Sequence, residues 1–199
     1  LGGVLSQLHK LGLYPGVIGT HEVQLTYTDG GFPGAIVIGL DQPDKLTAFE
    51  LARSVEQGII KYLIKINGRE GMSSALYLKE PLGISSLIIA CGYGGLSVEN
   101  AAGAILQGIS NANVKVRMLY SEKAKLIEHV ELVELYEDKA LNAIIAVRQL
   151  SKESGGSMNV TLEARTINKL SGAKRQMNLG QSNEWWNRIT ITQEINKKG

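Results

Sequence analysis

A glycine-rich turn between an apolar run and a helical pattern is the part of this sequence best suited to binding a ligand. The apolar run covers residues 86–91, and the residues that follow it before the helical pattern are Gly92, Tyr93, Gly94, Gly95, Leu96 and Ser97. A strand that passes through such a turn into a helix N-terminus gathers free backbone N–H groups, which attract anions. We therefore expect a phosphate or carboxylate to bind at residues 92–97. The alternative is that the glycines only permit a tight turn with positive φ.

Two features limit the chemistry of this turn. No Gly-Lys-Ser or Gly-Lys-Thr follows the glycines, which excludes a P-loop of the nucleotide-hydrolysing type. Cys91 precedes them, and a thiol beside a helix N-terminus can have a lowered pKa. A nucleophilic cysteine also needs a histidine base within reach, and His9, His21 and His129 lie in no recognisable motif. We therefore predict that Cys91 is a small packed side chain and that the chain holds no catalytic residue.

Metal and carboxylate chemistry have little support in the sequence. Three scattered histidines and a single cysteine give no metal-ligand spacing, so we expect no metal and no cofactor. An acidic run contains Glu131, Glu134, Glu137 and Asp138. On a regular strand Glu131 and Glu134 would face opposite sides of the sheet. Asp138 is more simply explained as a helix N-cap.

Composition excludes several classes of partner. The net charge of the 199 residues is +2, which predicts no strong attraction to nucleic acid or to a membrane surface. No apolar run approaches the roughly 18 residues of a spanning helix.

The lone cysteine suits a reducing compartment, so we expect a cytoplasmic protein. Trp185 and Trp186 could stack on bases, but at this net charge we expect them to pack against the core or a neighbouring domain. Because Leu1 is not a natural start, we expect the chain to be a fragment.

The first half of the chain reads as helix, hairpin and helix. Leu1, Leu5 and Leu8 have helical spacing, and residues 17–27 and 35–40 read as strands joined by a turn at 29–34. Thr47 and Glu50 form a capping box, which predicts a long amphipathic helix that ends at residues 67–68. Residues 74–78 could add a short strand.

The second half predicts a repeated strand and helix. We expect strands at residues 86–91 and 130–135, with Ser97 capping one helix and Asp138 capping the next. Residues 114–120 fit either helix or strand. The last helix is expected to bury apolar residues, namely Ala140, Leu141, Ile144, Ile145 and Leu150. Residues 159–164 and 189–195 alternate like antiparallel strands.

This order predicts an α/β domain with a mixed, partly parallel sheet over residues 1–150 and a C-terminal antiparallel β extension over residues 151–199. Ligands in such sheets bind at the carboxyl ends of the strands. The expected functional edge therefore contains residues 40–45, 91–97 and 135–138.

The segment from Ala90 to Ala102 resembles the phosphate loop and following helix of macro domains, where an apolar strand ends in Gly-x-Gly-Gly before an acidic, alanine-rich helix. Residues 2–8, 14–19, 35–40 and 46–50 resemble the macro-like N-terminal domain of cytosolic leucyl aminopeptidases. The resemblance implies a three-layer macro-like fold. Residues 1–30 contain no Asn-Ala-Ala-Asn-type motif, which contacts the distal ribose in macro domains.

The chain as a whole resembles a segment of large bacterial proteins that carry a caspase-like CHAT peptidase domain. Residues 13–20, 94–99 and 134–140 carry this resemblance, together with Trp185 and Trp186. We expect a non-catalytic ligand-binding or regulatory module of such a protein, whose partners are other domains of the parent polypeptide and a phosphate-containing small molecule. Self-association is a further expectation. The alternatives are an enzyme acting on ADP-ribose conjugates, a peptidase-related enzyme, or a purely structural interaction domain.

Overall fold

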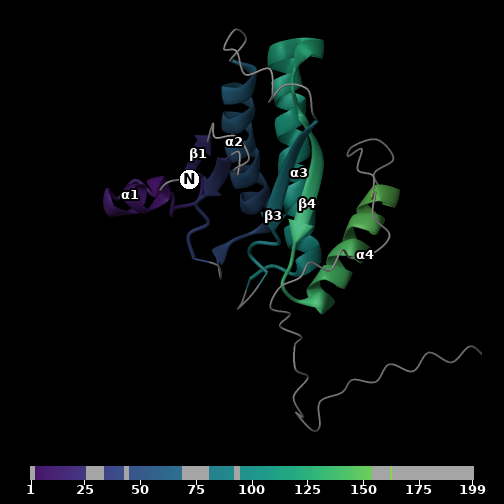
Figure 1. The fold of residues 1–199 in the computed structure, drawn as a ribbon. Coiled ribbons are helices and arrows are strands. Elements are labelled where there is room, and N and C mark those ends of the chain that lie inside the picture. The colour runs from purple at the N-terminus through teal and green to yellow at the C-terminus, as the bar shows by residue number, and fades with distance from the viewer. Residues whose placement is uncertain are drawn as a thin grey trace, which may run out of the picture.

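The computed structural model describes residues 3–25, 34–42, 45–68, 81–91, 95–153 and 162. Along the chain the elements are α1 (Val4–Lys10), β1 (His21–Leu25), β2 (Gly34–Ile38), α2 (Ala48–Asn67), β3 (Leu82–Leu87), α3 (Val98–Tyr120), a 3-10 turn η2 (Ser121–Lys123), β4 (Ile127–Val133) and α4 (Glu137–Glu153) (Figure 1). Among the described residues, no helix is both long enough and apolar enough to cross a membrane.

Two small sheets confirm the α/β class. β1 and β2 pair antiparallel with His21 opposite Ile38 and Leu25 opposite Gly34, which confirms the expected hairpin. β3 and β4 pair in parallel from Leu82 and Ile127 to Leu87 and Val133, with one register shift between Leu82 and Gly83, and α3 is the crossover between them. The sequence predicted one mixed, partly parallel sheet, whereas the described strands form two separate sheets, one antiparallel and one parallel. The three-layer macro-like arrangement stays a prediction.

The hairpin is attached to α2 through lysine side chains. Lys61 Nζ donates to Glu22 Oε2 at 3.0 Å, and Lys65 Nζ donates to the Val23 carbonyl oxygen at 2.8 Å. Val23, the buried residue of β1, is only 1% exposed. The ammonium groups of the two lysines thereby satisfy polar atoms of β1.

Helix α2 begins and ends where its sequence signals predict. The Thr47 hydroxyl accepts from the Glu50 amide at 3.2 Å, and Glu50 Oε2 accepts from the Thr47 amide at 2.9 Å. This capping box satisfies N–H groups that a helix start leaves without partners. The helix buries one apolar stripe, made by Leu51, Val55, Ile59 and Leu63. Gly68 follows its last residue as the C-cap, as expected.

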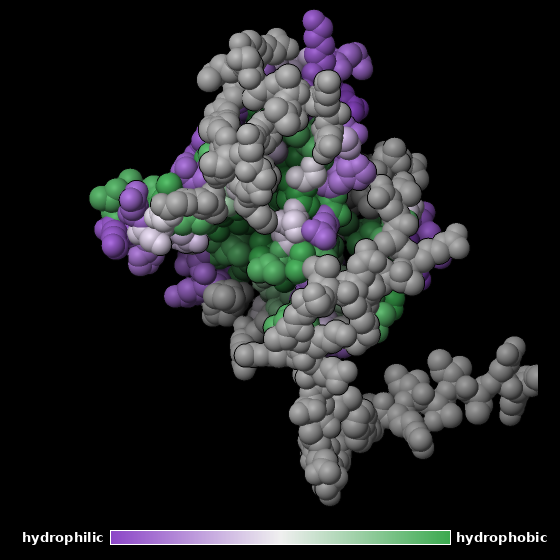
Figure 2. All heavy atoms as spheres, viewed as in Figure 1, coloured by the Kyte–Doolittle hydropathy of each residue, from purple (hydrophilic) through white to green (hydrophobic). Residues whose placement is uncertain are grey.

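The core lies between α2 and α3, and small residues of α3 allow the two helices to approach closely. Ala101, Ala104 and Ala112 of α3 are buried in the same cluster as Leu51 and Leu63 of α2. Figure 2 shows hydrophobic residues near the centre of one face, with hydrophilic residues around them. The helix continues unbroken to Tyr120, so the ambiguous residues 114–120 are helical.

Two asparagines fix the start of β4. Asn67 Oδ1 accepts from the Lys125 amide at 2.8 Å, and Asn67 Nδ2 donates to the Lys125 carbonyl at 3.0 Å. Asn113 makes the same pair of bonds to Ile127, at 2.9 and 2.8 Å. Each carboxamide therefore pairs with the backbone as a neighbouring strand would. These four bonds position the start of β4 against the end of α2 and the C-terminal half of α3.

The boundaries of β3 and β4 correct the expected strands. β3 ends at Leu87, not at Cys91, and β4 covers Ile127–Val133 instead of residues 130–135. Parallel pairing stops at the Leu87 and Val133 pair, and the Ile89 amide then turns back to the Leu87 carbonyl oxygen at 2.9 Å. The apolar run continues beyond β3 because Ile88 is buried, at 6% exposed, and Ile89, Ala90 and Cys91 pack against the core cluster.

The predicted start and buried face of α4 were wrong in part. The helix begins at Glu137, so Asp138 lies inside it and is not its N-cap. Leu141 and Ile145 are 50% and 52% exposed, although burial was expected. The buried face is made instead by Ala143, Ala146 and Val147, because small side chains let α4 approach α3.

Several predictions lie outside the described residues. These are the short strand at 74–78, the glycines 92 and 94 with Tyr93, the tryptophans 185 and 186, and the strand at 189–195. Leu162 is the described residue of the predicted strand 159–164. It packs against the small buried cluster formed by Leu106 and Val147.

Candidate functional site

The parallel pairing of β3 and β4 brings the segments that follow them to one edge of the sheet. The Ile88 amide donates to the Val133 carbonyl oxygen at 3.3 Å, immediately beyond the last strand pair. Residues 88–97 and residues 134–139 therefore start side by side, as expected of the carboxyl ends of parallel strands. Residues 40–45 follow β2, which belongs to the antiparallel sheet. Leu40 nevertheless packs against the same core cluster as Cys91 and Leu96.

A backbone hydrogen bond closes the base of the glycine turn. The Leu96 amide donates to the Ala90 carbonyl oxygen at 2.8 Å, and Ala90 adopts a positive φ of 67°. The turn is thereby fixed at both ends. Of the six residues expected to hold a ligand, Gly95 and Leu96 are half-buried and Ser97 is exposed, while the other three lie outside the described residues. The Leu96 amide already has an acceptor, so it is not free to bind a ligand in this arrangement.

Ser97 begins α3 as predicted. Its hydroxyl accepts from the Asn100 amide at 3.1 Å, and the Ala101 amide donates to the Ser97 carbonyl oxygen at 2.9 Å. The amides of Val98 and Glu99 come before the first intrahelical bond, so the helix offers them no carbonyl partner. The positive end of the helix dipole of α3 lies at the same place. An anion at this end would meet donors that are already oriented.

Lys139 adds a cation that the sequence predictions missed. Its Nζ donates to the Cys91 carbonyl oxygen at 3.1 Å, and it lies 5.1 Å from the centroid of the Tyr136 ring. The ammonium group is thus held at the base of the glycine turn. The sequence contained one signal for this lysine. Lys139 lies in the first turn of α4, where the helix dipole disfavours a positive charge, so a lysine is unusual at this position.

The environment of Cys91 argues against a nucleophile. Burial raises the pKa of the Cys91 thiol, and the Glu134 carboxylate raises it further, whereas Lys139 lowers it. The thiol donates to the Ile88 carbonyl oxygen at 2.9 Å and is protonated at neutral pH. His129 pairs in register with Gly83, at the opposite end of β3 from Cys91. His21 lies on β1 and His9 on α1.

The acidic residues of this edge serve the backbone. Glu134 Oε1 accepts from the amides of Leu135 and Tyr136, at 2.7 and 3.0 Å, and so stabilises the turn between β4 and α4. Glu131 is exposed on β4. Across the described part of the chain, no group of three or more His, Cys, Asp or Glu residues could hold a metal ion.

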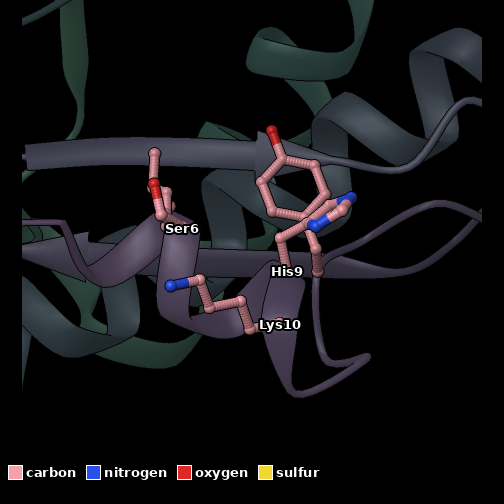
Figure 3. Close-up of a pocket in the computed structure, with 5 residues that line it drawn as sticks. Ser6, His9 and Lys10 are labelled. Carbon is pink, nitrogen blue, oxygen red and sulfur yellow. The ribbon is translucent and has the colours of Figure 1, made fainter.

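A second concave feature lies on α1, away from this edge. An open hollow of about 320 Å³ is lined by Leu5, Ser6, His9, Lys10 and Tyr14 (Figure 3). The His9 and Tyr14 rings meet edge to face with centroids 6.0 Å apart. α1 has no buried residue. The hollow is therefore formed by one short helix and the turn after it, and it has less support as a site than the β3–β4 edge.

No protein-family model matches this sequence, and comparison with curated proteins and with solved structures finds no match either. The resemblances to macro domains and to CHAT-associated proteins therefore stay proposals. The functional argument rests on the geometry of the β3–β4 edge.

Proposed function

We propose that this chain is a non-catalytic binding module that holds a phosphate-containing small molecule at the carboxyl ends of β3 and β4. The observation that carries the proposal is the position of the Lys139 ammonium group. It is bonded to the Cys91 carbonyl oxygen, in the segment that leads into the N-terminus of α3. A fixed cation and a helix N-terminus together provide the electrostatic field and the donors that a phosphate requires.

The lysine retains donors for a ligand. An ammonium group has three N–H donors, and the bond to Cys91 uses one of them. Lys139 is half-buried, so its charge is screened less than that of a fully exposed lysine. Because Tyr136 lies beneath the ammonium group, the side chain is also restricted in orientation.

The fold family of the module and the protein to which it belongs are part of the same proposal. The resemblances support a macro-like, three-layer domain over residues 1–150, followed by a β extension, within a larger cytoplasmic CHAT-associated bacterial protein. Its other partners would be neighbouring domains of that polypeptide. The parallel β3–α3–β4 unit supports an anion-binding edge independently of these names, because the unit itself brings Lys139 to the glycine turn.

Isothermal titration calorimetry with ADP-ribose, ADP and inorganic phosphate at low salt tests the proposal. Lys139→Gln should weaken binding by roughly tenfold or more, because a charge-assisted hydrogen bond is lost. Lys152→Gln, an exposed lysine in the last turn of α4, is the matched control and should leave affinity unchanged. Gly94→Glu should abolish binding by placing a carboxylate in the turn.

The same titrations separate the competing functions. If no phosphate compound binds at millimolar concentration, or if both lysine variants behave alike, the binding proposal fails and an interaction module is favoured. Turnover of an ADP-ribosylated peptide that Lys139→Gln removes would instead establish an enzyme at this edge.

A further inference from the structure

The outer edge of β1, which is the edge away from β2, carries the backbone groups of His21 and Val23. The Gly39 amide donates to the Thr20 carbonyl oxygen at 2.8 Å, one step before the first pair of the hairpin. In an antiparallel pair, every second residue bonds to the partner strand, and the residues between them point the other way. Glu22 is in phase with Thr20, so its backbone groups face β2. The carbonyl groups of His21 and Val23 therefore point to the outer edge.

Two lysines of α2 occupy these outward carbonyl groups. Lys61 Nζ donates to the His21 carbonyl oxygen at 3.3 Å, and Lys65 Nζ donates to the Val23 carbonyl oxygen at 2.8 Å. The helix and the strand match in spacing, because four residues of a helix rise about 6 Å and two residues of a strand rise about 6.7 Å. One helix therefore presents an ammonium group to each of two successive outward carbonyl groups.

Glu22 holds the first of these ammonium groups across the edge. A Cβ at Gly58 of α2 would lie 2.9 Å from the Ile36 Cγ2 and 4.0 Å from the His21 Cβ, so α2 covers the face of the hairpin that carries His21. Side chains alternate along a strand, so Glu22 lies on the opposite face. Its carboxylate accepts from Lys61 Nζ at 3.0 Å. The Lys61 side chain therefore crosses the outer edge of β1 from one face to the other.

The sequence of β1 is complementary to itself, which identifies the strand that this edge could accept. An antiparallel pair of two β1 strands centred on Val23 places His21 of one copy opposite Leu25 of the other. Glu22 then lies opposite Gln24, so no like charges face each other. The outward backbone groups of both strands meet in this register. Such a pair has the two-fold symmetry of an ordinary dimer interface.

We propose that Lys61 and Lys65 close the outer edge of β1 against pairing with β1 of a second copy of this chain. An added strand would have to take both carbonyl oxygens from the ammonium groups, and it would separate Glu22 from its cation. Lysine side chains at an edge strand are one of the means by which proteins avoid such pairing. This role is independent of the β3–β4 edge and of any ligand that binds there.

Sedimentation velocity over a range of protein concentrations, with the full chain and its Lys61→Ala/Lys65→Ala double variant, tests this inference. The double variant should pass from the mass of one chain to that of two as its concentration rises. Over the same range, hydrogen exchange at the amides of Val23 and Leu25 should slow by about tenfold, because these amides gain acceptors in the second copy. Lys61→Arg/Lys65→Arg retains the donors and is the matched control, which should show neither change. Glu22→Gln should also show neither, because it leaves the bonds to the carbonyl groups in place.

Two results would overturn the inference. One is a folded double variant that keeps the mass and the exchange rates of the unmodified chain at every concentration. The other needs no variant and therefore stands even if loss of both lysines detaches the hairpin. Hydrogen bonding should slow exchange of the Lys61 and Lys65 ammonium protons with water, compared with those of the exposed Lys152, in nitrogen-edited NMR spectra of the unmodified chain. Equal exchange at all three lysines would show that the carbonyl groups are not occupied.

Discussion

Replacing Gly108 by alanine tests the packing of α2 against α3, on which the position of the whole β3–α3–β4 unit depends. A Cβ atom at Gly108 would lie 2.5 Å from the Ala52 carbonyl oxygen and 2.9 Å from the Val55 Cβ. Both contacts are with backbone or with the stem of a branched side chain. Neither can be relieved by a simple rotation, so the two helices would have to move apart.

The magnitude follows from two opposing terms. Overpacking a closely packed core costs about 1–3 kcal/mol. Alanine is a better helix former than glycine by about 0.8–1.0 kcal/mol, and this gain offsets part of the cost. Because both contacts are shorter than 3.0 Å, the overpacking cost lies in the upper part of this range, about 2–3 kcal/mol, and we expect Gly108→Ala to lower the free energy of unfolding by about 1–2 kcal/mol.

Gly103 on the same helix provides the matched control. The nearest atom to a Cβ at Gly103 is the Leu150 Cδ1, 3.6 Å away, which is an ordinary contact. Gly103→Ala should therefore raise stability by up to about 1 kcal/mol through helix propensity alone. Urea unfolding followed by circular dichroism measures both variants. The reasoning is refuted if Gly108→Ala is as stable as the unmodified protein, or if the two variants change stability in the same direction.

Three further predictions concern single side chains. Asn113→Ala leaves buried backbone groups without partners and should cost about 1–3 kcal/mol in urea unfolding; an unchanged midpoint would contradict the role given to its carboxamide. The hydrogen bond from the Thr47 amide is the chief cause that lowers the pKa of the Glu50 carboxyl. The contribution of this bond to the free energy of unfolding is complete above the pKa that Glu50 has in the unfolded chain, and it is lost as pH falls through the pKa of Glu50 in the folded protein. Glu50→Gln, which removes the titrating carboxyl, should therefore flatten the acid limb of the stability profile, and an equally steep limb would count against this linkage. Because burial raises the pKa of Cys91, its alkylation by iodoacetamide should accelerate only at alkaline pH and should become slower still in Lys139→Gln; rapid alkylation at neutral pH would reveal an activated thiol.

Local signals predicted the helices better than the strands. The capping box of Thr47 and Glu50 and the Ser97 cap each depend on residues within one turn, so the sequence alone locates these helix starts. The end of β3 depends on its partner instead. The pair ends at Val133, and the chain turns after Leu87 although the apolar run continues to Cys91. No pattern within residues 86–91 contains that information.

The candidate site was predicted only in part for a similar reason. The glycine turn and the start of α3 are contiguous in the sequence and could be recognised together. Lys139 lies 48 residues from Cys91 in the chain, and only the parallel pairing of β3 with β4 brings them together. The exposed Leu141 and Ile145 show the same limit, because helical spacing identifies apolar faces but not which of them another helix covers.

An NMR titration of the full chain with ADP-ribose, and separately with inorganic phosphate, tests the central claim most directly. If the β3–β4 edge is the binding site, the chemical shifts that change at the lowest ligand concentration are those of the amides of Gly95, Val98 and Glu99 and of the Lys139 side chain. Both ligands should move the same set, because the phosphate group is the part that is recognised. Shifts confined to the His9 hollow on α1, or no shifts at millimolar ligand, would contradict the account.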